Sequence, residues 1–302
     1  MKLVSDFDGV WTFPDEESRA QGEVLDRALI ESSPEAERAA AAVWVRDARD
    51  AASAEPTRYG WAPGGKLSCF GDEDPFAFHS ALLHYLLARA ADGDAMALRM
   101  RDAVIEQHGS IDKFGGWSHA EGVKQVAETR GPGVLAAAAD AGRHMLESGI
   151  EVVVVSNSGT DKLAHWFEHA GVPHTVHPEG RPGALRLRGS GRKFILDSER
   201  SDPIDIGGVS IETARPFYEE ALKDEVPDAI VGDVFSLDLA LPLALKRRGE
   251  AFANMRLFWL MQPYSPPWLR ESVIAAAGDE VELVEGGLAG VAQRLVGKAS
   301  AS

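Results

Sequence analysis

The sequence predicts an α/β fold, a doubly wound parallel sheet that carries an inserted α-helical domain. Three short apolar runs, at residues 3–4, 152–155 and 229–231, each end in polar residues. Such near-continuous runs of Val, Ile and Leu are typical of strands buried on both faces of a parallel sheet. Between the first two runs, residues 14–130 are alanine-rich and 3.6-periodic with no clear strand, which indicates the inserted domain.

The first apolar run ends in two carboxylates one residue apart, Asp6 and Asp8. Ligands of open α/β sheets bind at the carboxyl edge of the strands, so we expect Asp6 at that edge and Asp8 on the following loop. Like charges this close raise each other's pKa, so the pair is suited to holding a cation such as Mg²⁺ or to acid-base work. A plain turn is the alternative, because Asp and Gly are common turn residues.

The other two strand ends supply different chemical groups. Ser156 and Asn157 offer hydroxyl and amide groups for phosphate oxygens, and they precede an expected helix whose N-terminal amides favour an anion. Asp233 offers a hard oxygen ligand for Mg²⁺, and Asp238 follows it by five residues. Each end taken alone also fits an ordinary junction between a strand and a loop.

Taken in order, these strand ends resemble the signature of the haloacid dehalogenase (HAD) superfamily: a strand ending in DxD, a strand ending in Ser or Thr, a basic residue, and a strand ending in an acidic pair. The matching residues are Asp6, Asp8, Ser156, Gly232, Asp233 and Asp238. The resemblance implies a Mg²⁺-dependent phosphohydrolase in which Asp6 attacks phosphorus and forms an aspartyl-phosphate. It implies that Asp8 protonates the leaving group and then activates water, and that the metal site comprises Asp6, Asp233, Asp238 and the Asp8 carbonyl.

The resemblance also indicates the substrate class. Family members that act as dehalogenases, phosphonatases or ion pumps lack an acid at the position of Asp8, so its presence favours hydrolysis of a small phosphorylated metabolite. Phosphoryl transfer, as in a sugar phosphomutase, needs the same residues and stays open. A catalytically silent phosphate-binding or regulatory protein is the third alternative, because motifs alone do not establish turnover.

Arg215 is the expected basic residue of the phosphate site. It precedes Pro216 and a helical stretch, as the family's Lys-Pro does, and its planar guanidinium binds phosphate through two nitrogens. Lys193 and Lys223 are the alternatives. Each of the three also fits a solvated surface cation.

The domain boundaries follow from these assignments. Residues 1–13 and 131–302 are predicted to form the HAD-like core, and residues 14–130 an α-helical cap. Gly131, Pro132 and Gly133 are the expected hinge. Helices are predicted at 36–51, 76–91, 96–108 and 134–148, and strand-like pieces of a β-hairpin extension at 185–187, 193–196 and 208–211.

Composition argues against several classes of binding partner and cellular location. The formal net charge of −16 disfavours nucleic acid and anionic membranes, whose binding depends on basic contacts. No apolar run approaches the roughly 20 residues of a membrane helix, and the single Cys69 excludes an internal disulfide framework. With no charged leader before an apolar stretch, we expect a cytoplasmic protein.

Four further segments carry weaker signals. Residues 165–169 match the H-x-x-E-H pattern of zinc proteases, but the apolar stripe of the expected helix leaves His165 and His169 on the opposite, solvated face. Residues 58–61 with Lys66, and 113–117 with His119, are predicted cap loops, either specificity elements or anchors. The aromatic, proline-rich stretch after residue 250 is expected to pack on the core or to form a homodimer contact.

Overall fold

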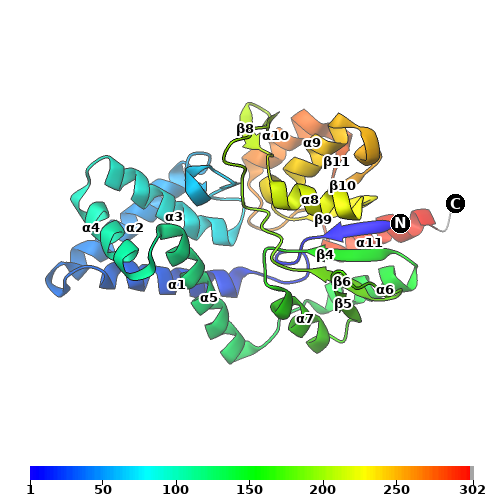
Figure 1. Cartoon of the computed structure of the whole chain (residues 1–302), viewed down its shortest axis with the longest axis horizontal. Helices are drawn as coiled ribbons and strands as arrows, with labels where there is room; N and C mark the ends of the chain where they lie inside the picture. The colour runs from blue at the N-terminus through cyan, green and yellow to red at the C-terminus, as the bar shows by residue number, and fades with distance from the viewer. Residues whose placement is uncertain (300–302) are drawn as a thin grey trace. The chain divides into compact units, whose positions relative to one another are not determined.

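A computed structural model describes residues 1–299 and divides the chain into two compact units (Figure 1). The core unit comprises Met1–Phe13 and the chain from Pro132 onward, and the helical unit comprises Pro14–Gly131. No helix among the described residues is long and apolar enough to cross a membrane.

A seven-stranded sheet in which all neighbours are parallel forms the centre of the core unit. Its strands are β1 (Lys2–Ser5), β4 (Glu151–Val155), β5 (His174–Val176), β6 (Leu185–Arg188), β9 (Ala229–Gly232), β10 (Arg256–Leu260) and β11 (Val281–Val284). Their order across the sheet is β11-β10-β9-β1-β4-β6-β5. The predicted α/β class with a parallel sheet is confirmed, and the three predicted strands lie side by side at its middle.

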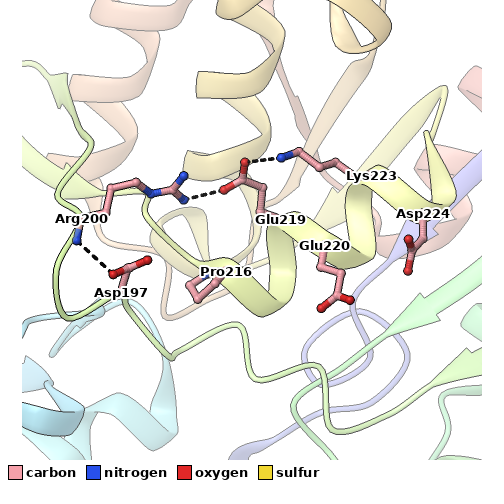
Figure 2. Close-up of a pocket in the computed structure, with 7 residues that line it drawn as sticks. All are labelled: Asp197, Arg200, Pro216, Glu219, Glu220, Lys223 and Asp224. Carbon is pink, nitrogen blue, oxygen red and sulfur yellow. Dashed lines mark hydrogen bonds and ion pairs between the residues drawn. The ribbon is translucent and has the colours of Figure 1, made fainter.

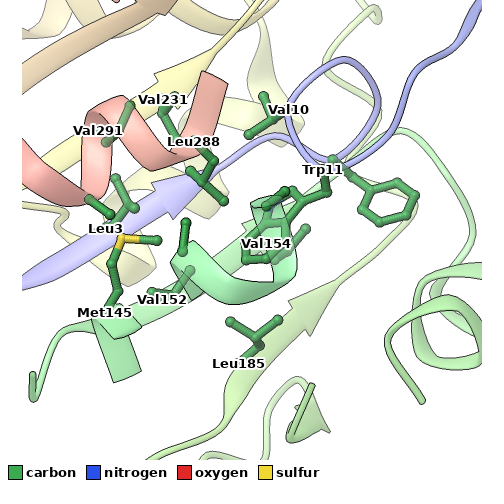
Figure 3. Packing of buried hydrophobic residues seen from close by; sticks show 14 of the residues in the cluster. Leu3, Val10, Trp11, Met145, Val152, Val154, Leu185, Val231, Leu288 and Val291 are labelled. Atoms are coloured by element: carbon green, nitrogen blue, oxygen red, sulfur yellow. The ribbon is translucent and has the colours of Figure 1, made fainter. Parts of the chain in front are cut away.

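Helices flank this sheet on both faces (Figure 1). Alternate residues of a strand point to opposite faces, so Leu3, Val152 and Val154 lie together in one buried cluster. The same cluster takes in residues of α6 (Ala136–Glu147), α7 (Thr160–His169) and α11 (Gly287–Ala299), and Figure 3 shows Met145, Leu288 and Val291 packed against the strands. The helices drawn on the other side are α8 (Pro216–Glu225), α9 (Ala240–Arg248) and α10 (Pro267–Ala277).

Five helices make up most of the helical unit, namely α1 (Asp15–Glu31), α2 (Arg38–Ala54), α3 (Pro75–Ala91), α4 (Ala95–His108) and α5 (Ile111–Arg130). Asp74, Asp94 and Ser110 cap the last three helices by accepting hydrogen bonds from backbone amides of the first turn. The helices share a buried core that includes Leu25 and Phe114. Two short antiparallel strands, β2 (Gly60–Trp61) and β3 (Cys69–Phe70), complete the unit.

The segment 113–117, predicted as a loop, lies inside α5. Its glycines suggested a break, but the packing of helices overrides their low helix propensity. Phe114 is fully buried among the other helices. Further along α5, a Cβ on Gly122 would lie 2.5 Å from the backbone nitrogen of Gln21 in α1, so glycine permits the two helices to approach closely.

The region 184–213 differs in part from its prediction, since 185–187 and most of 208–211 are strands and 193–196 is not. Residues 185–187 belong to β6 of the main sheet, and 193–196 form a turn and irregular backbone instead of a strand. A separate two-stranded antiparallel ladder joins β7 (Pro203–Ile206) to β8 (Val209–Glu212). The residues after β6 are held by hydrogen bonds to neighbouring loops, which a local pattern of residue types does not reveal.

The helical unit contains a buried histidine, His79 of α3. Its Nδ1 lies 3.1 Å from Nη1 of Arg49, and its Nε2 lies 3.0 Å from Oγ of Ser18, which donates to the Pro75 carbonyl. Because a guanidinium only donates, Nδ1 must accept and His79 must be neutral, with its proton on Nε2. Burial and the Arg49 charge lower the pKa of His79 to about 3.

This histidine should make the stability of the helical unit depend on pH. The folded-state pKa lies below the unfolded value, so His79 adds stability above pH 6.5 that is lost as the pH falls toward 3, by up to about 1.4 kcal/mol per pH unit. We expect His79→Gln to flatten this dependence in urea unfolding between pH 7 and 4. His165→Gln, which replaces an exposed histidine, is the control, and equal slopes for His79→Gln and wild type would contradict the assignment.

Candidate active site

Three carboxylates converge at the carboxyl edge of the sheet. Asp6 follows β1 and its amide donates to the Val231 carbonyl of β9 at 2.9 Å, while Asp233 directly follows β9. Asp238 completes the group, and one oxygen from each of the three residues lies within 4.8 Å of the others. Asp233 and Asp238 are buried and Asp6 is nearly so. The predicted metal residues Asp6, Asp233 and Asp238 are thus brought together.

A π-helical turn at Phe235–Leu239 carries Asp238 back to the end of β9. The Val234 amide donates to its Oδ2 at 3.1 Å, and the Asp238 amide donates to the Val234 carbonyl at 2.8 Å. A Cβ on Gly232 would collide with the Asp238 side chain. Glycine at the strand end is therefore required for this carboxylate to fold back against the sheet.

Lys193 is the cation of this cluster. Its Nζ lies 2.6 Å from Oδ1 of Asp6 and 2.5 Å from Oδ1 of Asp238, and the residue is 1% exposed. The backbone on both sides of its side chain is fixed, because its amide donates to Oδ1 of Asn157 at 2.7 Å and its carbonyl accepts from Nη1 of Arg215 at 2.6 Å. The Lys193 side chain is thus held in place from its backbone to its ammonium group.

The structure places the other two candidate cations elsewhere. Arg215, predicted to bind phosphate, is fully buried and bonds to the Lys193 carbonyl. Lys223 is exposed and pairs with Glu219 at 2.8 Å on the wall of a surface hollow of about 390 Å³ (Figure 2). The sequence offered one signal for Lys193, the Gly-Ser-Gly run that precedes it after β6.

The charges of the cluster do not balance. Burial and the neighbouring Asp238 carboxylate raise the pKa of Asp6 to about 8, and the Lys193 ammonium opposes this only in part. Burial also works against the charged form of Lys193, but Asp238 and Asp6 outweigh it and raise the pKa of the ammonium. One cation is therefore too little for three carboxylates, and the oxygen-rich donor set suits a hard divalent cation such as Mg²⁺.

Asp8 lies outside the three-carboxylate group. Its Oδ2 accepts from Oγ of Ser158 at 2.8 Å, and its Oδ1 lies 3.4 Å from Nζ of Lys162 in the first turn of α7. The Lys162 ammonium also lies over the Trp166 ring, 4.8 Å from the centroid. The carboxylate of Asp8 is 22% exposed, so it is held in one orientation and yet remains open to solvent.

Ser156 and Asn157, the predicted phosphate-binding pair, lie where β4 ends. Oγ of Ser156 accepts from the Ser158 amide at 3.0 Å, and Asn157 accepts from the Lys193 amide. Their loop is joined to the loop after β6, because the Gly191 amide donates to the Ser156 carbonyl at 2.7 Å. The second loop contains two non-glycine residues at positive φ, Ser190 and Arg192, a strained backbone that clusters at functional sites.

Sequence reasoning missed the contribution of β10 and of the segment that follows it. Nε1 of Trp259 donates to the Asp233 carbonyl at 2.8 Å, and the Tyr264 hydroxyl donates to Oδ2 of Asp233 at 2.7 Å. Gln262 adds a bond from Nε2 to the Gly9 carbonyl at 2.5 Å. These aromatics were expected to pack on the core or to form a homodimer contact, because the sequence does not reveal that β10 lies beside β9.

Gly9 makes room for this arrangement. It has a φ of +78°, and a Cβ there would collide with the Asp233 carboxylate and lie 2.6 Å from the Tyr264 hydroxyl. The glycine after the DxD motif is therefore needed both for its backbone conformation and for the space it leaves.

The two histidines of the H-x-x-E-H pattern are exposed on α7, opposite the buried Leu163, Trp166 and Phe167. This confirms the expected face. Among residues 1–299, the group of metal-ligating side chains found contains neither of them.

A scan against protein-family models and a search of curated proteins found no match to this chain. The assignment of a function therefore depends on the geometry of the site and on the motif resemblance.

Removing the buried cation should destabilise the core unit. Lys193→Met leaves the Asp6 and Asp238 carboxylates without their shared ammonium, and we expect the free energy of unfolding in EDTA to fall by about 3 kcal/mol. The control, Lys223→Met, removes an exposed ion pair and should cost less than about 1 kcal/mol. Equal losses in urea denaturation would show that Lys193 is not the compensating charge.

A second pair of variants separates backbone strain from lack of space. Gly149 has a φ of +77° and nothing within 4 Å of its missing Cβ, so Gly149→Ala should cost only about 1 kcal/mol. Gly9→Ala adds the collision with Asp233 and Tyr264, and we expect a total cost of about 3 kcal/mol in urea unfolding. A loss no greater than that of Gly149→Ala would contradict the close contact at Gly9.

Proposed function

We propose that this chain is a HAD-type, Mg²⁺-dependent phosphohydrolase that cleaves a small phosphomonoester through an aspartyl-phosphate. One observation carries the proposal: the Asp6, Asp233 and Asp238 carboxylates converge at the carboxyl edge of a parallel sheet, with Lys193 on two of them. The order of the strand ends, which resembles the HAD signature, supports the same reaction.

Asp6, Asp233 and the Asp8 carbonyl would hold the Mg²⁺, with Asp238 beside them. The excess of buried carboxylate over cation supports this placement, as does the raised pKa of Asp6. When bound, Mg²⁺ supplies charge neutralisation for phosphoryl oxygens. It also favours the ionised form of Asp6, which is the form that attacks.

Asp6 is the proposed nucleophile. A carboxylate oxygen of Asp6 forms a bond to phosphorus while the bond to the ester oxygen breaks, which splits one difficult displacement into two easier ones. Its fixed place at the end of β1, set by the bond from its amide to Val231, supports in-line attack from a rigid element.

Asp8 is the proposed general acid and base. It gives a proton to the leaving ester oxygen, and it then takes one from the water that attacks the aspartyl-phosphate. The bonds from Ser158 and Lys162 hold its carboxylate in one orientation, and its partial exposure gives access to water. Both features support this role.

Lys193 is the proposed cation for the phosphoryl oxygens, in place of Arg215. Its ammonium lies 2.6 Å from the attacking carboxylate, so it is close to any group bonded there. Arg215 contributes indirectly, because its guanidinium donates to the Lys193 carbonyl and so holds the Lys193 backbone in place. Ser156 and Asn157 hold the two loops that frame this position, and they complete the proposed phosphate site.

The decisive measurement is phosphate release from an aryl phosphate and from a panel of metabolite phosphates, with Mg²⁺ or EDTA. We expect Mg²⁺-dependent turnover that falls at least about thousandfold in Asp6→Asn, because the nucleophile is lost. Asp8→Asn should block turnover or accumulate the phosphoenzyme. Asp140→Asn, on the exposed face of α6, is the control and should keep wild-type activity.

Each other result points to one alternative. Turnover retained in Asp6→Asn would remove the nucleophile assignment. Phosphoenzyme that discharges to an added hydroxyl compound instead of water would indicate a transferase, such as a sugar phosphomutase. Phosphate binding with neither release nor phosphoenzyme would indicate a silent binding protein.

A further inference from the structure

The turn after β10 is built to present Tyr264 to the carboxylate cluster. The Ser265 amide donates to the Gln262 carbonyl at 3.0 Å, which closes a four-residue turn, and the Gln262 amide donates back to Oγ of Ser265 at 2.9 Å. Pro263 occupies the second position of this turn, where its fixed φ is favourable. The turn therefore holds its shape through its own bonds, and Tyr264 is placed by a rigid segment.

The same turn is tied to the sheet and to the DxD loop. The Met261 amide donates to the Val284 carbonyl at 3.0 Å, and the Gln262 side chain donates to the Gly9 carbonyl. The Tyr264 hydroxyl meets Oδ2 of Asp233 at 2.7 Å, a short bond of the kind formed with an ionised acceptor. The missing Cβ of Gly9 leaves the space in which the hydroxyl and the carboxylate meet.

This bond limits how Asp233 can bind a metal. An oxygen that accepts the Tyr264 hydroxyl is less available to a cation, so Asp233 would bind through its other oxygen alone. The same holds at Asp6, where Oδ1 takes the Lys193 ammonium. At Asp238 both oxygens are already bonded, Oδ1 to the Lys193 ammonium and Oδ2 to the Val234 amide, so Asp238 stands beside the metal position. Asp6 and Asp233 are therefore each arranged to give one oxygen to a metal.

One-oxygen ligands distinguish the two common divalent cations. Mg²⁺ is small and requires near-octahedral geometry at about 2.1 Å, whereas Ca²⁺ takes 6–8 oxygens and often binds a carboxylate through both. A hydrogen bond that keeps Oδ2 of Asp233 away from the metal thus disfavours the larger ion more than the smaller one. Partners of metal ligands commonly set affinity in this way.

We infer that Tyr264 is a positioning residue that restricts Asp233 to one-oxygen binding and so makes the site select Mg²⁺ over Ca²⁺. The inference rests on the proposed function for the metal site itself. Tyr264 lies on the turn after β10 and does not touch the reacting atoms. It would nevertheless set the choice of metal at a site formed by the ends of β1 and β9.

The test is calorimetric titration of the full chain with Mg²⁺ and with Ca²⁺, using wild type, Tyr264→Phe and Tyr85→Phe. Tyr264→Phe keeps the ring and removes the hydroxyl, and Tyr85→Phe is the same change in α3 of the helical unit. We expect Tyr264→Phe to weaken Mg²⁺ binding about tenfold. Ca²⁺ binding should stay equal or tighten, so the affinity ratio should fall at least tenfold, while Tyr85→Phe keeps the wild-type ratio.

A second variant guards against an effect of misfolding. Ser265→Ala removes one bond of the turn and keeps the Tyr264 hydroxyl. Because the loosened turn holds that hydroxyl on Asp233 less firmly, the Mg²⁺ to Ca²⁺ affinity ratio should fall about threefold. Thermal unfolding in EDTA checks that each variant is folded. If Tyr264→Phe fails to fold, the Ser265→Ala ratio decides.

The outcomes separate this inference from the proposed function. Wild type that binds neither ion would overturn the metal site and the inference with it. Wild type that prefers Mg²⁺, with the same ratio in folded Tyr264→Phe, would overturn the inference alone. An equal change in Tyr85→Phe would do the same, because the effect would not belong to the Asp233 contact.

Discussion

The candidate site depends on one buried cation, the Lys193 ammonium between Asp6 and Asp238. Carboxylates removed from water and placed close together repel each other, and each is costly to keep ionised without a partner. Lys193 compensates part of that charge, and the contacts from Asn157 and Arg215 to its backbone keep it there. The loops after β4 and β6 and the start of α8 are therefore organised around a single side chain.

The sequence predicted those parts of the site that are local to a strand end. Asp6, Ser156 and Asp233 each follow an apolar run, and parallel strands bring such ends to one edge whatever their order. Lys193 was named only as an alternative to Arg215, and Tyr264 was not identified, because their places depend on which strands are neighbours and on how the loops between them bond. Arg215 was chosen on its resemblance to a motif, and its actual contact with a backbone carbonyl could not be read from residue types.

The fold was likewise predicted where the signal is local in sequence and missed where it depends on packing between elements. Runs of β-branched residues predicted the central strands, and periodicity predicted helices near α2, α3, α4 and α6. Helix α5 was missed in part because its glycines have low helix propensity, although one of them, Gly122, permits a close contact with α1. Local propensity is thus a poor guide where a small residue is needed for packing between helices.

The place of β1 in the sheet has a consequence for the order of folding. This strand is made before the other strands of the sheet, yet it pairs with β4 and β9, whose residues follow it by about 150 and 230 positions. The helical unit is continuous in sequence, so its contacts can form while the rest of the chain is still being synthesised. Asp6 therefore stays without Asp233 and Asp238 until β9 and the turn that follows it have been synthesised.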